Sequence, residues 1–177
     1  MSKKVDPVGK PLIIRYKGLY DYDGLYKFMA DWFQKQRYRW WEKRYKDKVY
    51  SPLGNEIELD WVAEKEVTEF VKYHVTIAFH TFDSKEVDVT INGKTMKRMT
   101  GRIQINFKVE VELDWQDQYK EGKFKQLLFK IYKDIIARWD LETGHYDPLT
   151  YQVMDLMTQV KKYLGIQTSE SAYPTMV

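Results

Sequence analysis

The sequence predicts an α+β protein with an antiparallel sheet of about five to six strands and helices packed on one face. The main observation is the run from Arg102 to Trp115, in which seven apolar residues alternate strictly with polar ones. This period of two is typical of a long antiparallel strand with one buried and one solvated face. The second observation is that helical periodicity occurs only before and after the central run of strands. Such segregation is typical of the α+β class.

Composition limits the class of protein. A length of 177 residues predicts one domain, which we place at residues 1–165 with a polar C-terminal tail at 166–177. A net charge of +3 is too balanced for a general nucleic-acid binder. The absence of cysteine excludes disulfides and thiolate metal sites. With no visible secretory signal and no apolar run long enough for a transmembrane segment, we expect a cytoplasmic protein.

The first third of the chain predicts an arm, a strand and a helix. Residues 1–10 are polar and read as an N-terminal arm, and a strand follows from Leu12 to about Gly18. Asp21 and Asp23 are suited to capping a helix over about 23–36. Its apolar stripe has spacings of three and four and consists of Leu25, Phe28, Met29, Trp32 and Phe33.

The segment 37–50 fits either a helix or a strand. Its aromatic content favours a strand, which we predict. One face would then carry Arg39, Trp41, Lys43 and Tyr45, and the other Tyr38, Trp40, Glu42 and Arg44.

A run of strands follows the turn at 51–55. The alternation that begins at Ile57 continues to Phe82, and we interpret it as passing through a bulge near residues 64–66. After a turn at 83–85, a short strand ends at Asn92-Gly93, the strongest hairpin signal in the chain. The return strand is expected to be interrupted around 100–101 before it resumes to Trp115.

Two helices are predicted near the C-terminus. The first covers about 123–139, and we expect its Leu128, Ile131 and Ile135 to pack against Phe107, Val109 and Val111. The second begins with Asp147 as N-cap and Pro148 at the first helical position, and ends at Gly165.

This order of elements resembles that of the helix-grip proteins (the START and Bet v 1 type), in which a curved antiparallel sheet wraps a C-terminal helix around an apolar cavity. The resemblance concerns element order alone, and here one helix follows the first strand where those proteins usually have two short ones. It implies a carrier of a small apolar ligand and assigns no functional residue.

Residues suited to catalysis or metal binding do not form a recognisable set. His74 and His80 lie roughly 20 Å apart along one strand, and His145 lies in a late loop. We expect two groups of carboxylates on the solvated face of the sheet, where they would form a charge ladder, a row of ion pairs with Lys and Arg of neighbouring strands. The two groups are Glu56, Glu58 and Asp60, and Glu110, Glu112 and Asp114. We therefore predict no catalytic, cofactor-binding or metal-binding residues and no cofactor.

The strongest candidate for a partner-binding surface is a basic and aromatic stretch. Cations interleaved with rings suit single-stranded nucleic acid, an anionic membrane surface or an acidic protein, and an ordinary strand with a solvated basic face is an equally good interpretation. Adjacent Trp40 and Trp41 cannot both enter one core. The candidate surface consists of Arg37, Tyr38, Arg39, Trp40, Trp41, Arg44, Tyr45 and Lys46.

We expect a non-enzymatic protein that acts through protein–protein contacts, in a homo-oligomer or a larger assembly. The high aromatic fraction of 16% and the absence of a catalytic motif favour this function. The alternatives are a helix-grip-like carrier and a single-stranded nucleic-acid binder through 37–46. Self-association or another protein is the expected partner, and nucleic acid is not favoured.

Overall fold

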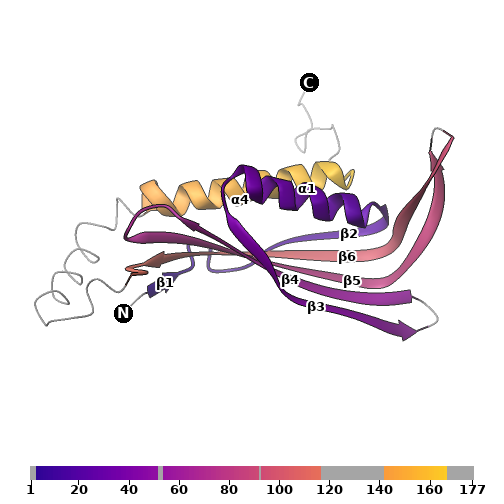
Figure 1. Cartoon of the computed structure of the whole chain (residues 1–177), viewed down its shortest axis with the longest axis horizontal. Coiled ribbons are helices and arrows are strands. Elements are labelled where there is room, and N and C mark those ends of the chain that lie inside the picture. The colour runs from indigo at the N-terminus through magenta and orange to yellow at the C-terminus, as the bar shows by residue number, and fades with distance from the viewer. Residues whose placement is uncertain (1–2, 52–53, 92, 117–141, 167–177) are drawn as a thin grey trace, which may run out of the picture.

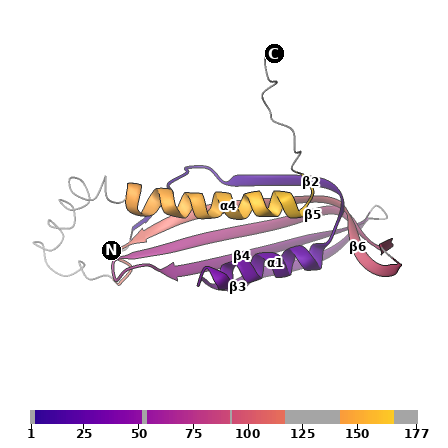
Figure 2. The ribbon, with the colours of Figure 1, turned by 90° about the horizontal axis from the view of Figure 1, so that it is seen from above.

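Within the described residues, a mostly antiparallel, open sheet of six strands carries two helices on one face (Figures 1 and 2). The computed structural model describes residues 3–51, 54–91, 93–116 and 142–166. The elements in chain order are β1 (Lys3–Val5), β2 (Leu12–Tyr20), α1 (Tyr22–Lys35), β3 (Arg39–Ser51), β4 (Gly54–Glu66), β5 (Val71–Ile91), β6 (Lys94–Leu113), a π-helical turn (Glu142–Tyr146) and α4 (Asp147–Tyr163).

The strand order leaves β3 at one edge of the sheet. Consecutive hairpins place β3 beside β4, β4 beside β5 and β5 beside β6. At the other edge, β1 and β2 pair with successive parts of β6. The predicted α+β class and strand number are confirmed, whereas the predicted helix at 123–139 lies outside the described residues.

The alternation of apolar and polar residues in β6 determines, as predicted, which side chains are buried. From Ile103 to Leu113, every second residue is buried, and the residues between them are exposed or half-buried. The prediction that Phe107, Val109 and Val111 are buried is confirmed. Their predicted partners at 128–135 lie outside the described residues, and among the described helices α4 contacts β6.

Helix α1 follows the predicted pattern. The Asp21 carboxylate accepts a hydrogen bond from the backbone N–H of Gly24 at 3.0 Å, which satisfies one free donor of the first turn. Its buried stripe contains Leu25, Met29, Trp32 and Phe33.

Helix α4 begins differently from the prediction. The N-cap position is Tyr146 rather than Asp147, because a π-helical turn leads directly into the helix and places Asp147 in its first turn. The helix ends as predicted, with Gly165 at a φ of 69° in the left-handed conformation common after a helix. Its buried residues are Leu149, Val153, Leu156, Met157 and Val160.

Four predictions about the strands were wrong. The arm at 1–10 contains β1, which pairs with the end of β6. The alternation from Ile57 to Phe82 does not pass through a bulge: residues 67–70 form a turn in which Thr68 Oγ1 accepts from the backbone N–H of Val71 at 2.9 Å. Strand β6 runs without interruption from Lys94 but ends at Leu113, before Trp115.

Glycines and a register shift lie along one line across four strands. Gly18 of β2 lies opposite Gly101 of β6, β5 has a register shift between Phe82 and Lys85, and Gly54 of β4 lies against the backbone of Asp83. The predicted turn at 83–85 is thus an irregularity within β5. Beyond this line, the ends of β5 and β6 form a two-stranded ribbon that curves away from the sheet (Figure 1).

The described helices include none with the length and apolar character needed to cross a bilayer.

Candidate functional site

The predicted partner-binding surface at 37–46 lies in and just before edge strand β3. Arg37, with a φ of 60°, belongs to the connection that follows α1. Tyr38 is 5% exposed and packs against Trp32 and Phe33, so it contributes to the core rather than to a surface. The prediction of a strand here, rather than a longer helix, is confirmed.

A bulge in β3 changes which of its side chains lie on the same face of the sheet. Trp40 lies opposite Ala63 and Glu42 opposite Trp61, on the side covered by helices. The register shift between Glu42 and Arg44 then places Tyr45 on this same side. Arg44 moves to the opposite side with Trp41, so the simple alternation expected across 38–45 was wrong after Glu42. We call the sheet face opposite α1 and α4 the open face.

The two adjacent tryptophans have different surroundings. Trp40 is half-buried and stacks on Trp61 with ring centroids 4.5 Å apart. Trp41 is 38% exposed on the open face, with the Arg39 guanidinium 5.8 Å from its ring centroid. The prediction that they cannot share one core is confirmed.

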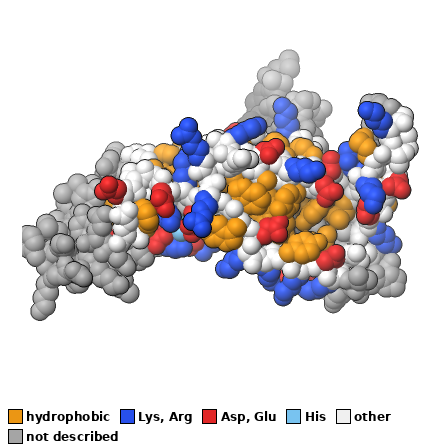
Figure 3. Space-filling model, viewed as in Figure 1, with side chains coloured by type: hydrophobic (Ala, Val, Ile, Leu, Met, Phe, Trp, Pro, Cys, Tyr) orange, Lys and Arg blue, Asp and Glu red, His pale blue; other side chains and the backbone are white. Residues whose placement is uncertain are grey.

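Four rings, one exposed and three half-buried, form an aromatic patch beside the β3 edge. The aromatic patch consists of Tyr22, Tyr26, Trp40 and Tyr45, with Tyr45 55% exposed. Hydrophobic side chains gather over this region of α1 and the strands beneath it (Figure 3). Tyr26 donates a hydrogen bond to the Glu42 carboxylate. Partial burial and this carboxylate raise the pKa of Tyr26 to about 12, so its hydroxyl remains a donor at neutral pH.

The open face next to this patch carries a basic column and an acidic column. Arg44 of β3 donates to Asp60 at 2.8 Å and lies 3.1 Å from Glu58, both of β4. Lys48 donates to Glu58 at 2.7 Å, and this hydrogen bond lowers the pKa of the Glu58 carboxyl. These contacts form the charge ladder predicted for the solvated face.

One carboxylate of the predicted ladder lies elsewhere. Asp114 is 1% exposed and has a φ of 54°, because the chain leaves β6 there and its backbone N–H donates to the Phe70 carbonyl. The prediction that Asp114 lies on the solvated face was wrong. The strict alternation of the sequence extends beyond the end of the strand, and alternation alone does not mark that end.

The three histidines all contact other polar side chains. His74 is buried, with Nδ1 3.3 Å from Glu64 and Nε2 2.5 Å from Glu112. His145 Nδ1 lies 3.0 Å from the Tyr73 hydroxyl.

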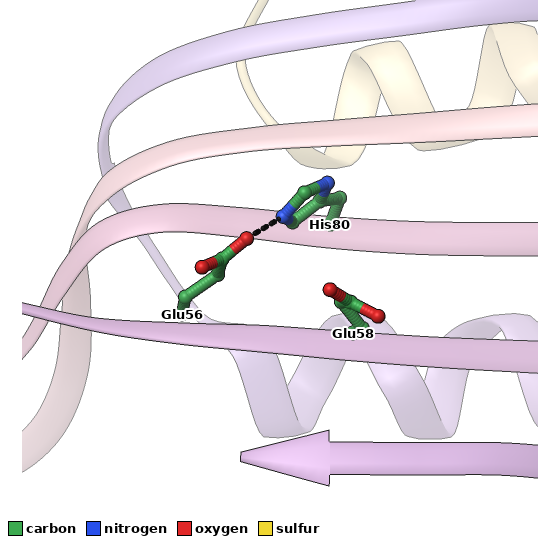
Figure 4. A group of neighbouring side chains, drawn as sticks. All are labelled: Glu56, Glu58 and His80. Carbon is green, nitrogen blue, oxygen red and sulfur yellow. Dashed lines mark hydrogen bonds and ion pairs between the residues drawn. The ribbon is translucent and has the colours of Figure 1, made fainter. Parts of the chain in front are cut away.

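His80 meets two carboxylates that sequence reasoning did not connect with it. Its Nε2 contacts Glu56, and Glu58 lies directly across the β4–β5 ladder (Figure 4). One ligand atom from each of the three residues lies within 4.8 Å of the other two. Spacing along one strand excludes a metal shared by His74 and His80, but it does not test residues of the neighbouring strand. The overlooked signal was the Glu-x-Glu pattern on the polar face of the preceding strand, which hairpin pairing brings opposite His80.

Comparison with protein-family models, with curated proteins and with solved structures gives no significant match.

Proposed function

We propose that this protein is a non-enzymatic interaction protein that binds another protein through edge strand β3. The observation that carries the proposal is the partly exposed aromatic patch beside an edge strand. Tyr45, more than half exposed, continues a surface formed by half-buried Tyr22, Tyr26 and Trp40. Aromatic residues of this kind are enriched at protein interfaces, because they provide a large contact area and a polar group together.

The edge itself offers backbone hydrogen-bonding groups. Strand β3 has 13 residues, and within the described parts of the chain β4 is the one strand that pairs with it. Its outer edge therefore suits an added extended segment, a common mode of peptide recognition. Such a segment would place alternate side chains over the aromatic patch and the others beside the open face.

Charge indicates the kind of partner. Strand β3 contains five basic residues against Glu42 and Asp47. A second copy of β3 would bring like charges together, which is unfavourable across paired strands. The opposite edge is also basic, since β2 contains Arg15 and Lys17 and no acid. We therefore propose an extended partner segment in which apolar residues alternate with Asp or Glu, in a larger assembly rather than a β3-paired homodimer.

The alternative functions have less support. For single-stranded nucleic acid, a net charge of +3 is too balanced for a general binder, and Arg44 is already paired with Glu58 and Asp60. For a helix-grip-like carrier, the core beneath α1 is filled by large side chains such as Trp61 and Phe33, both 0% exposed. The expected cavity beneath 123–139 lies outside the described residues.

A peptide titration tests the proposal. A fluorescent peptide of about nine residues that alternates Val and Glu should bind and shift backbone amide resonances of β3, whereas a Val/Lys peptide should not. The Lys43→Glu/Lys46→Glu variant should bind at least tenfold more weakly. A Lys10→Glu/Lys17→Glu variant, with the same change in net charge away from β3, should bind as the wild type does.

Two results would overturn the proposal. One is equal weakening by both charge reversals, which would indicate nonspecific electrostatic attraction. The other is a stable dimer in sedimentation at micromolar concentration that Lys43→Glu/Lys46→Glu alters, because the occupant of the edge would then be a second copy.

A further inference from the structure

We propose that Glu56, Glu58 and His80 bind one divalent transition-metal ion, with Zn²⁺ preferred over Mg²⁺ and Ca²⁺. The three side chains come from neighbouring strands and converge on the open face (Figure 4). The proposal concerns a site separate from the β3 edge and does not depend on the proposed partner.

Local backbone geometry brings the ligand atoms together. Glu56 and Glu58 are two residues apart on β4, so both project to the open face. His80 lies opposite Glu58 in the register, and an irregularity between Asn55 and Glu58 allows the Glu56 carboxylate to reach His80 Nε2. Ligand atoms within 4.8 Å of one another need small side-chain rotations to share one ion.

The donor set indicates the class of metal. One imidazole nitrogen with two carboxylate oxygens suits zinc and similar borderline ions, which bind nitrogen and oxygen at about 2.0–2.2 Å. Magnesium and calcium prefer a shell of oxygens. Three protein ligands leave room for an external ligand, and an adjoining pocket of about 290 Å³, lined in part by Glu56, Phe82 and Arg102, offers space for water or a small anion.

The His80 ring is held in place before any metal binds. It packs against Phe82, with ring centroids 3.8 Å apart and an interplanar angle of 31°. Phe82 is in turn covered by Arg102, whose guanidinium carbon lies 5.2 Å from its ring centroid and which pairs with Asp83 at 2.6 Å. Orientation of a ligating histidine by surrounding groups lowers the entropic cost of binding a metal.

His74 provides a matched contrast on the same strand and face. It also contacts two carboxylates, but Glu64 approaches Nδ1 and Glu112 approaches Nε2. These oxygens lie on different sides of the ring, so they cannot join one ring nitrogen around one ion. At His80 the two carboxylates lie on the Nε2 side (Figure 4).

Two protein cations compete for the site. Lys48 and Arg44 lie 2.7 Å and 3.1 Å from the Glu58 carboxylate oxygens. Both are long, exposed side chains on the edge strand, so they can swing away when a divalent ion arrives. The structure therefore predicts that removal of the Lys48 charge strengthens metal binding.

Isothermal titration of chelator-treated, tag-free protein with ZnCl₂ tests the site. The expected result is one Zn²⁺ per chain, retained in excess Mg²⁺. Association should weaken at least tenfold in His80→Gln and in Glu56→Gln, strengthen severalfold in Lys48→Met, and remain unchanged in His74→Gln. Circular dichroism of each variant checks that the fold is kept. Zn²⁺ should raise the melting temperature of the wild type but not that of His80→Gln or Glu56→Gln.

Several results would overturn the inference. One is an absence of binding at 100 µM Zn²⁺. Another is a stoichiometry well above one Zn²⁺ per chain that His80→Gln does not change. A third is an equal loss of Zn²⁺ affinity in His74→Gln and His80→Gln. A Lys48→Met variant that binds no more tightly would show that Lys48 does not compete with the metal for the Glu58 carboxylate.

Discussion

Trp40 of the edge strand stacks on Trp61 of β4, with ring centroids 4.5 Å apart and an interplanar angle of 29°. Trp61 is 0% exposed, and Tyr26 of α1 meets it edge-on at 4.7 Å. The contact thus joins the aromatic patch to the centre of the core. A ligand that binds the patch would therefore alter the surroundings of a buried tryptophan.

The Trp61→Ala substitution should lower the free energy of unfolding by roughly 3–5 kcal/mol, because it removes the largest fully buried side chain among the described residues and leaves a cavity. Urea denaturation followed by circular dichroism measures the loss. Trp41→Ala, at an exposed position on the open face, is the matched control and should cost much less. Equal losses of unfolding free energy in the two variants would contradict the assignment of Trp61 to the core and of Trp41 to the open face.

Phe107→Ala should also destabilise the protein by roughly 3–5 kcal/mol. Phe107 is 1% exposed and lies between Ile77 of β5 and Leu12 of β2 in the sheet. The neighbouring exposed residue provides the control: Lys108→Ala should change stability by about 0.5 kcal/mol or less. A small effect of Phe107→Ala in the same urea titration would place the core elsewhere.

Gly101→Ala should cost roughly 1–3 kcal/mol through backbone strain. A Cβ at Gly101, where φ is +152°, would lie 2.9 Å from the Phe82 carbonyl oxygen and from the Ser84 Cα. Thermal unfolding of this variant should be compared with that of Gly144→Ala, because a Cβ there meets nothing within 4 Å. Similar melting temperatures for the two variants would show that the sheet tolerates a side chain at Gly101.

Stability should fall steeply in alkaline solution. Burial raises the pKa of Tyr20, Tyr22 and Tyr38 above 10, and raises that of Tyr26 to about 12 with the help of Glu42. In the unfolded chain these phenols ionise near pH 10. Their contribution is therefore complete below about pH 10 and is lost as the pH rises from there through the folded-state values.

Urea midpoints between pH 8 and pH 12, with phenolate absorbance recorded in parallel, measure this loss. Tyr38→Phe should flatten the alkaline decline, while at pH 8 it should cost about 0.5–1.5 kcal/mol for the hydrogen bond to Gln152. An unchanged slope in this variant would remove Tyr38 from the explanation.

The sequence was sufficient for the class of fold and for the buried faces, because alternation and helical spacing follow directly from the geometry of strands and helices. It predicted the helix stripe that includes Met29 and the buried run through Phe107. It did not predict the turn at 67–70, because apolar alternation continues on both sides of it. The candidate site could not be predicted from local sequence, because Glu56 and His80 are 24 residues apart and meet only through hairpin pairing. Strand register is set by the whole sheet rather than by local sequence.

The basic character of both sheet edges has a consequence for the behaviour of the protein in concentrated salt. Repulsion between the cationic edge strands acts over roughly 8 Å at physiological ionic strength and over about 3 Å at 1 M salt. Salt therefore weakens the barrier to edge-to-edge contact, while hydrophobic burial in the core is little affected. We expect the folded protein to lose colloidal stability before it unfolds, and to remain dispersed best in dilute buffer.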